Sequence, residues 1–211
     1  MLKKYRGTLI AGTLVMLLPI LVGLLLWDRL PDQVATHFGA SGEADGYSSK
    51  AFAVFGIPGI VLGMHWLCVL TGRLDPKAGN LAGRMMSLVL WICPVISVVL
   101  IVLVYGNALG YDVRVELILP LLLGLLFVII GNWLPKCRQT YTLGIKLPWT
   151  LNDEDNWNRT HRFAGPVWVG CGLVIMLCAA LNAVWAMFAA LAVMVIAPTV
   201  YSFLLSRRKG K

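Results

Sequence analysis

Six continuous apolar runs, each about twenty residues long, constrain the fold of this chain more than any other feature. A helix needs about 20 residues to cross the roughly 30 Å of hydrocarbon in a bilayer. A membrane β-barrel would instead show alternating hydrophobicity over segments of about 10 residues. The pattern therefore predicts an all-α polytopic membrane protein with six transmembrane helices, at 7–27, 51–71, 85–105, 113–134, 164–181 and 183–205.

Composition supports this class. The chain is 59% hydrophobic and 13% charged, against about 45–50% and about 25% in soluble domains. The N-terminal MLKKYRG followed by an apolar run has the form of a signal peptide. However, the run is longer than a typical signal core, and no small-residue cleavage site precedes Trp27. We therefore interpret it as the first membrane span.

The cations predict the orientation. The segments on one side of the six spans carry fifteen Lys and Arg residues, and those on the other side carry three. Loops rich in Lys and Arg stay in the cytoplasm. This asymmetry places both termini and a loop at 135–163 in the cytoplasm and a loop at 28–50 outside. The net charge of +8 is then explained by topology, and we expect no direct contact with nucleic acid.

The two polar loops suggest a division into two three-span units. Residues 1–110 form an N-terminal unit with the outer loop 28–50, and residues 111–211 form a second unit with the cytoplasmic loop 135–163. Asn182 is the polar break between the last two spans, which predicts a tight helical hairpin.

The outer loop, DRLPDQVATHFGASGEADGYSSK, is too polar to enter lipid. Asp45-Gly46 indicates a turn, and Ser48 or Ser49 is a good N-cap for the next span. His37, Glu43 and Asp45 can converge on a cation or a polar ligand, but one histidine and two carboxylates do not specify a metal site. We favour a compact loop with a structural or recognition role over metal binding or catalysis by His37 and Asp45.

The inner polar stretch, Gly131 to Gly165, holds eight permanent charges and His161. Gly144 permits a turn, and Thr150 or Asn152 can cap a short helix that runs to about Arg162. This helix would lie along the membrane, anchored by Trp149, Trp157 and Phe163, before the fifth span. Two interpretations stay open: a docking surface for a soluble partner, or a connector folded onto the bundle.

The spans hold few chemical groups. Gly56, Gly59 and Gly63 form a small-residue stripe that predicts close helix packing. His65 lies deep in the second span, where an ionisable residue indicates function by default, although a neutral imidazole bonded to a neighbouring helix explains it better. Prolines inside the spans predict kinks. The five cysteines show no metal or redox spacing, and catalytic motifs such as HExxH or G-x-S-x-G are absent from the sequence. We expect a protein that is not an enzyme, with no cofactor.

Two motifs carry a family resemblance. GNWLPKCRQTYTLGIKLPWTL, followed by WNRTHRFAG, resembles the signature of the SdpI family of membrane immunity proteins. LPDQVATHFGASGEADGY is similar to a small domain of unknown function that often precedes that signature. This chain departs from the family pattern at Thr140, where Asn is common, at Lys146, where Arg is common, and at Ala35, where Pro is common.

The resemblance implies an integral immunity or sensor protein of the bacterial cell membrane, with multiple spans. Such a protein confers resistance to a secreted, membrane-active peptide toxin and holds a cytoplasmic transcriptional repressor at the bilayer. The alternative is a membrane enzyme or lipid-handling protein that uses His37 and Asp45 or His161 and Arg162. By position, the inner, partner-binding residues are Asn132, Pro135, Tyr141, Gly144, Pro148, Trp149, Thr150, Trp157, Thr160, His161 and Arg162. The outer set is His37, Phe38, Gly42, Glu43, Asp45 and Gly46.

Overall fold

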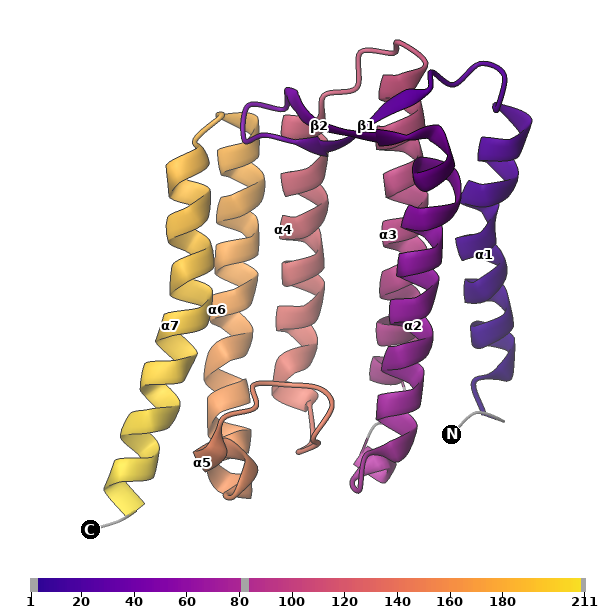
Figure 1. The fold of residues 1–211 in the computed structure, drawn as a ribbon. Helices are drawn as coiled ribbons and strands as arrows, with labels where there is room; N and C mark the ends of the chain where they lie inside the picture. Colours follow the sequence, from indigo (N-terminus) through magenta and orange to yellow (C-terminus); the bar gives the residue numbers. More distant parts are fainter. Residues whose placement is uncertain (1–3, 81–83, 210–211) are drawn as a thin grey trace. The chain divides into compact units, whose positions relative to one another are not determined.

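A computed structural model describes residues 4–80 and 84–209 (Figure 1). The helices are α1 (Arg6–Leu25), α2 (Ile57–Leu74), α3 (Arg84–Ala108), α4 (Val115–Trp133), α5 (Pro148–Leu151), α6 (Glu154–Ala180) and α7 (Val184–Lys209). Two strands, β1 (Gln33–Phe38) and β2 (Ala44–Ser49), precede a π-helical turn, Phe52–Gly56. Short 3₁₀ turns occupy Ala78–Asn80 and Leu134–Lys136.

Among residues 4–80 and 84–209, six helical segments are long and apolar enough to cross a membrane, with mean hydropathy between 2.0 and 2.9. They begin at Arg6, Phe52, Met86, Val115, Glu154 and Val184. The predicted fold class, an all-α protein with six transmembrane helices, is therefore confirmed.

The chain forms two compact units. One contains Met1–Leu74 and Ala82–Val115, and the other contains Asp75–Leu81 and Glu116–Lys211. The first unit holds α1, the strands, α2 and α3. The second holds α4 to α7 and, in addition, the segment that lies between α2 and α3 in the sequence.

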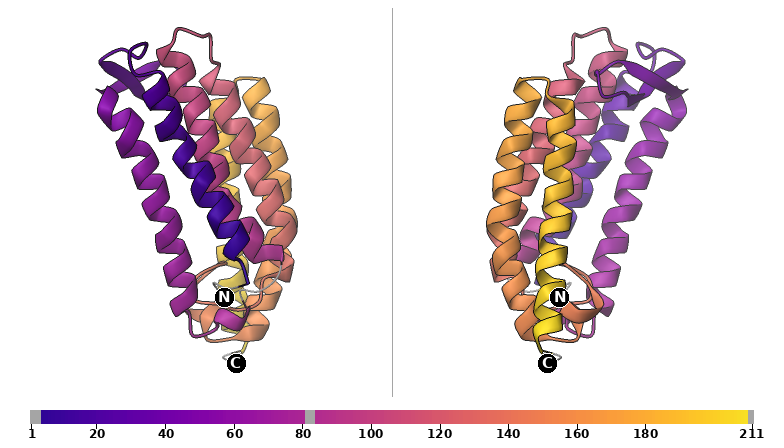
Figure 2. Two further views of the ribbon diagram at one scale, coloured as in Figure 1. Left: turned by 90° about the vertical axis from the view of Figure 1, so that its right-hand side faces the viewer. Right: turned by 90° about the vertical axis from the view of Figure 1, so that its left-hand side faces the viewer.

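In the first unit, α1 packs against α3 through glycines. A Cβ atom on Gly12 would lie 3.1 Å from Pro94 Cγ, and one on Gly23 would lie 2.5 Å from the Tyr105 hydroxyl. Around Tyr105, the core of this unit contains Leu30, Val34, Ala53, Val54 and Val104. β1 contributes Val34 to that core, so the strands lie over the C-terminal end of α3 (Figure 2).

The π-helical turn has a cause in the sequence. Pro58 has no N–H and cannot donate to the carbonyl of Val54, four residues before it. The N–H of Ile57 bonds instead to the carbonyl of Phe52, five residues back.

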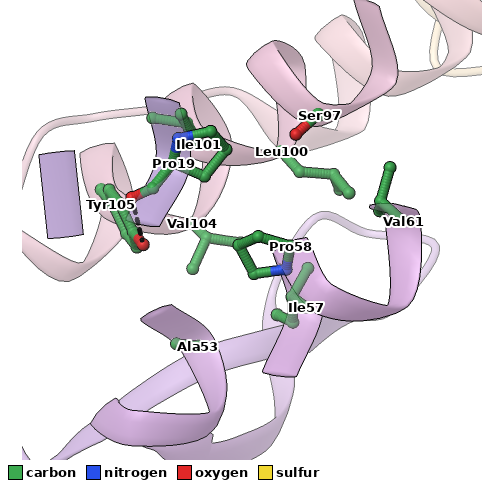
Figure 3. A pocket seen from close by; sticks show the side chains of 10 residues that line it. All are labelled: Pro19, Ala53, Ile57, Pro58, Val61, Ser97, Leu100, Ile101, Val104 and Tyr105. Atoms are coloured by element: carbon green, nitrogen blue, oxygen red, sulfur yellow. Dashed lines mark hydrogen bonds between the residues drawn. The ribbon is translucent and has the colours of Figure 1, made fainter. Parts of the chain in front are cut away.

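A small cavity of about 10 Å³ lies between α1, α2 and α3 (Figure 3). Pro19, Pro58, Ser97 and Tyr105 are among the residues that line it. The Tyr105 hydroxyl donates to the carbonyl of Pro19 at 3.1 Å. The Ser97 hydroxyl is buried without a hydrogen-bond partner among the described residues.

In the second unit, α4 and α6 touch through two glycine pairs. A Cβ atom on Gly172 would lie 2.6 Å from the carbonyl oxygen of Gly124, and one on Gly131 would lie 2.8 Å from that of Gly165. The two pairs are seven residues apart on each helix, which is about two turns. Glycine at these four positions lets the two backbones come into direct contact.

α6 and α7 form the helical hairpin that Asn182 indicated. Asn182 adopts a left-handed backbone with φ of 52°, a conformation that asparagine tolerates better than most residues. In α7, Pro198 cannot donate to the carbonyl of Met194. The indole N–H of Trp168 on α6 donates to that carbonyl instead, at 3.2 Å. The carbonyl that Pro198 leaves without a helical partner is thus the one that joins α7 to α6.

Several expectations from the sequence are wrong. The outer loop is an antiparallel β-hairpin, and Asp45 and Gly46 lie within β2 rather than in a turn. The reversal is at residues 39–43, where Gly42 has a φ of 84°. Ser49, one of the two expected caps, accepts the N–H of Phe52 at 3.3 Å.

The glycine stripe on α2 does not bring helices together. A Cβ atom on Gly59 or Gly63 would meet nothing within 4 Å, and one on Gly56 would meet only the nearby Phe52 ring. Close packing depends instead on glycines in α1, α4 and α6, where the opposing element is a backbone or a ring.

The short interfacial helix and the fifth span are one helix, α6. Asp153 caps it, because its carboxylate accepts the N–H groups of Asp155 and Asn156; Thr150 and Asn152 do not. Trp157 is fully buried, so it is no interfacial anchor. Trp149 and Phe163 are half-buried against α7, where Trp149 donates to Ser202 and Phe163 stacks on Tyr201.

Candidate functional site

The candidate site is the inner loop, residues 137–152, which folds onto the N-terminal part of α6. It contains little regular structure apart from the single turn of α5. Its hydrogen-bond partners outside the loop belong to α6, α7 and the segment 75–80. These contacts decide which signature residues are available to a ligand.

His161 is the centre of this arrangement. Its ring is fully buried and stacks on Trp157 with 4.1 Å between ring centroids. Nε2 accepts the N–H of Ile145 at 2.9 Å, and Nδ1 lies 2.8 Å from the carbonyl oxygen of Trp157. Because a carbonyl can only accept, Nδ1 carries the proton and the imidazole is neutral. Both ring nitrogens are therefore used within the fold.

Gly144 fits over this stack. Its φ is 108°, in the region that glycine adopts without strain. A Cβ atom here would lie 2.7 Å from both His161 Nε2 and Trp157 Cη2. The backbone bends at Gly144, and the glycine is needed because the loop backbone approaches two rings closely.

Trp157 and Cys137 fix the start of the loop. The Trp157 indole donates to the carbonyl of Cys137 at 2.8 Å. Cys137 is itself buried, and burial raises the pKa of its thiol to about 11. A thiol with this pKa stays protonated at neutral pH and is a poor nucleophile.

Asp75 holds the middle of the loop, although it lies 66 residues before it. Its Oδ2 accepts the N–H groups of Tyr141 and Thr142, each at 2.9 Å, and the Thr142 hydroxyl at 2.6 Å. Its Oδ1 accepts the N–H of Lys77 at 2.7 Å. Burial raises the pKa of the Asp75 carboxyl, but these four hydrogen bonds outweigh burial and leave the pKa below its usual value.

Gln139 is a second anchor. Its amide nitrogen donates to the carbonyls of Thr150 and Leu151 at 2.8 and 3.0 Å. Its side-chain oxygen accepts Lys77 Nζ, and its backbone carbonyl accepts the Asn80 amide at 2.8 Å. The segment 75–80 and the two ends of the inner loop thus form one hydrogen-bonded assembly.

α7 holds the loop from the other side through Ser202, which is fully buried. Trp149 Nε1 donates to the Ser202 hydroxyl at 2.9 Å, and the Asn156 amide donates to the Ser202 carbonyl at 3.0 Å. Thr160 donates to Asn156 Oδ1 at 3.0 Å. The Thr150 hydroxyl accepts the N–H of Leu147 and donates to the carbonyl of Ile145.

The inner residues singled out from the sequence therefore divide into two groups. Thr150, Trp157, Thr160 and His161 are buried and hold the loop in shape. The exposed group is Asn132, Pro135, Tyr141, Gly144, Pro148 and Arg162, and Trp149 is half-buried. The signature is thus as much a scaffold as a surface.

The exposed part of the inner loop is basic and aromatic. Tyr141 is 49% exposed, with Lys77 Nζ 5.8 Å from its ring centroid. Lys146 Nζ lies 3.2 Å from the carbonyl of Thr142. Arg138 and Arg162 are exposed as well.

The outer residues lie on the β-hairpin. His37 Nδ1 and Asp45 Oδ1 are 2.5 Å apart, and the two side chains are 75% and 54% exposed. Gly46 is opposite His37, where a Cβ atom would lie 2.8 Å from His37 Cβ. Glu43 is exposed, and Phe38 and Gly42 are half-buried. The pair is well formed but open to solvent.

Other candidate groups are poor ligands. Over residues 4–80 and 84–209, no three His, Cys, Asp or Glu side chains gather where they could bind a metal ion. His65 is 2% exposed, and its Nε2 has no hydrogen-bond partner among those residues. The expected bond from His65 to a neighbouring helix is therefore not made through Nε2.

Several residues of the site were missed by the sequence analysis. The sequence analysis assigned no role in the site to Asp75, Lys77, Gln139, Asn156 or Ser202. Ser202 lies inside an apolar run and Asn156 inside a charged segment, which are weak signals. The Asp-Pro pair followed by Lys77 was the visible cue for a structured segment at 75–80.

Comparisons with known proteins agree with the two motifs. Residues 136–202 match the SdpI/YfhL protein family, and residues 14–62 match DUF1648, a domain of unknown function. The chain is 29% identical over 170 residues to Immunity protein SdpI of Bacillus subtilis strain 168, covering 79% of this chain and 78% of that protein. No solved structure matches. The resemblance seen in the sequence is thereby confirmed: this multi-pass protein of the bacterial membrane carries an SdpI/YfhL family segment at residues 136–202 and a DUF1648 segment at residues 14–62.

Proposed function

We propose that this chain is a membrane immunity protein that protects its cell from a secreted, membrane-active peptide toxin. The observation that carries the proposal is the similarity to an immunity protein over 79% of the chain. The two matched segments include both the outer hairpin and the inner loop. The protein acts by binding rather than by catalysis.

In this proposal the two polar loops have separate roles. The outer hairpin meets the toxin through exposed side chains such as Tyr47, which is 62% exposed. The inner loop holds a cytoplasmic repressor against the surface formed by Tyr141, Lys146 and Arg162. The anchoring of the loop by Asp75, Gln139 and His161 supports this role, because a preorganised surface loses less conformational entropy on binding.

A toxin-challenge assay with one variant on each loop tests the proposal. Tyr47→Ala should reduce survival of cells exposed to the toxin, whereas Tyr111→Ala, an equally exposed tyrosine outside the hairpin, should not. Arg162→Glu should leave protection intact and abolish co-purification of the repressor, with Arg73→Glu as the matched control. Equal survival with and without the wild-type protein would overturn the immunity function itself.

A second candidate is a membrane enzyme or lipid-handling protein, favoured by the short contact between His37 and Asp45. An exposed histidine oriented by a carboxylate is suited to general-base catalysis. His161 does not support this function, since both of its nitrogens are bonded and its ring is fully buried. Lipid turnover by the purified protein that is lost in His37→Ala and Asp45→Ala would favour the enzyme.

A further inference from the structure

An apolar groove of about 490 Å³ lies on the lipid-facing side of the α6–α7 hairpin. Phe163 of α6 and Tyr201 of α7 stack at its inner end, with 4.3 Å between ring centroids. From there it follows one face of α7 through Val200, Ala197 and Val193. Val193 and Val200 are 50% and 48% exposed, so the groove is open along its length.

Two small residues of α7, Ala192 and Ala197, line the groove together with Val193, Ile196 and Val200. The wall is entirely hydrocarbon and aromatic in character. A groove of this shape and chemistry, within a membrane-spanning hairpin, suits an acyl chain.

Arginines lie beyond the inner end of the groove on the faces that form it. Residues four apart share one face of a helix. Arg159 is four residues before Phe163, and Arg208 is four residues after Leu204, which also lines the groove. Arg159 is half-exposed, and Arg208 is exposed.

Other charges nearby leave this end positive. Asp155 Oδ2 lies 3.9 Å from Arg159 and offsets part of its charge. Arg162 is exposed beside Phe163, and the Arg207 guanidinium lies 5.7 Å from the centroid of the Phe203 ring. Glu154 is nine residues before Phe163, about half a helical turn away from the groove face. Arg159, Arg162, Arg207 and Arg208 therefore leave this end of the hairpin positively charged.

We propose that this groove binds an anionic phospholipid, with an acyl chain along α7 and the phosphate between Arg159 and Arg208. Charge complementarity selects the headgroup, because basic side chains at the membrane surface attract anionic lipids. The inference does not rest on the immunity function, since the two arginines proposed to hold the phosphate, Arg159 and Arg208, belong neither to the outer hairpin nor to the surface proposed for the repressor.

Photo-crosslinking of the full-length protein in vesicles tests the proposal. Two lipids with the same photoactivatable acyl chain are compared, one phosphatidylglycerol and one phosphatidylcholine, and the labelled residues are mapped by mass spectrometry. We expect phosphatidylglycerol to label residues 193–204 preferentially. Equal labelling of these residues by the two lipids would overturn the proposal.

Two variants test the two parts of the site. Arg159→Gln with Arg208→Gln should reduce phosphatidylglycerol labelling roughly fivefold for each arginine and leave phosphatidylcholine labelling unchanged. The matched control, Lys136→Gln with Arg138→Gln, removes two cations after α4 and should change nothing. Ala197→Phe should fill the groove and reduce labelling by both lipids.

Folding is checked separately, because the helix hairpin must remain intact in each variant. Unchanged thermal unfolding of Ala197→Phe together with unchanged labelling would exclude the groove as the lipid site. An equal loss of labelling in the Lys136 and Arg138 control would show that only overall charge matters, which would also overturn the proposal.

Discussion

At the scale of single residues, the inner loop depends on positions where only one side chain fits. Gly144→Ala should lower the free energy of unfolding by about 1–3 kcal/mol, the usual cost of a strained backbone conformation, and by more if the rings cannot move. The reason is the positive φ together with the approach of its Cβ to His161 and Trp157. Unfolding in mild detergent measures this change.

Gly79→Ala is the matched control, because a Cβ atom there would meet nothing within 4 Å. Its unfolding should be close to that of the wild type. If the two variants unfolded alike, the close approach of Gly144 to the rings would not contribute to stability.

The Asp75 carboxylate should make the inner loop sensitive to acid. Its pKa in the folded protein lies below the unfolded value of about 3.9, so its stabilisation is complete well above pH 3.9. That stabilisation is lost as the pH falls through the lower, folded pKa. Asp75→Asn should lose about 1.5–3 kcal/mol near neutral pH, as expected for hydrogen bonds to a charged group.

Hydrogen exchange at the amides of Tyr141 and Thr142, corrected for intrinsic rates, follows this effect. Wild type and Asp75→Asn should differ at pH 7 and converge in strong acid. Asp28→Asn, an exposed carboxyl, should leave the exchange of both amides unchanged. If the two amides exchanged at the same rate in the wild type and in Asp75→Asn at pH 7, the charge of Asp75 would not stabilise the loop.

Ser97 tests the opposite case, a buried polar group that makes no bond. Ser97 is 2% exposed, and its buried hydroxyl has no partner among the described residues. Removing an unsatisfied hydroxyl removes its desolvation cost. Ser97→Ala should therefore unfold at the same or a higher denaturant concentration than the wild type, and a clear destabilisation would indicate a partner such as a bound water.

At the scale of elements, the α4–α6 crossing is set by the glycine pairs rather than by shape-matched large side chains. Gly172→Ala should destabilise by about 1–3 kcal/mol, the usual cost of overpacking, because its Cβ would lie 2.6 Å from the Gly124 carbonyl. Gly170→Ala, two residues away on α6, meets nothing and should be neutral or stabilising by up to about 1 kcal/mol. Unfolding curves of the two variants in the same detergent decide the matter.

The elements also show what the sequence was able to predict. The six spans follow from apolar length, which the bilayer imposes on any helix that crosses it. The start of α6 was placed wrongly, because Thr150, Asn152 and Asp153 are all good caps within four residues. Only the structure distinguishes them. The Thr150 hydroxyl donates to the carbonyl of Ile145, whereas the Asp153 carboxylate accepts the N–H groups of Asp155 and Asn156 at the start of α6.

Two other elements were not predictable for different reasons. The hairpin strand β2 is a polar sequence with a half-buried pattern and little β-branched character, which gives a weak strand signal. The anchoring of the inner loop by Asp75 joins residues 66 and 67 positions apart, and local patterns in one sequence contain no record of such pairs. The signature residues were found through the resemblance, but their division into scaffold and surface required coordinates.

At the scale of the whole molecule, six spans require both termini to lie on the same side of the membrane. The cation distribution predicts that this side is the cytoplasm. In a Cys68→Ser background, a membrane-impermeant maleimide should label Ser41→Cys on intact cells, and Tyr141→Cys only after permeabilisation. The reverse pattern would invert the orientation and exchange the roles proposed for the two loops.

The membership of residues 75–81 in the second unit affects how related proteins can be recombined. A chimera that exchanges only the C-terminal half at residue 111 would combine one relative's inner loop with another's Asp75, Lys77 and Asn80. Those three residues make direct bonds to Tyr141, Thr142 and Gln139. A functional chimera must therefore transfer two separate stretches, the segment 75–81 and the C-terminal half from Glu116. The unit that would have to be exchanged is discontinuous in the sequence.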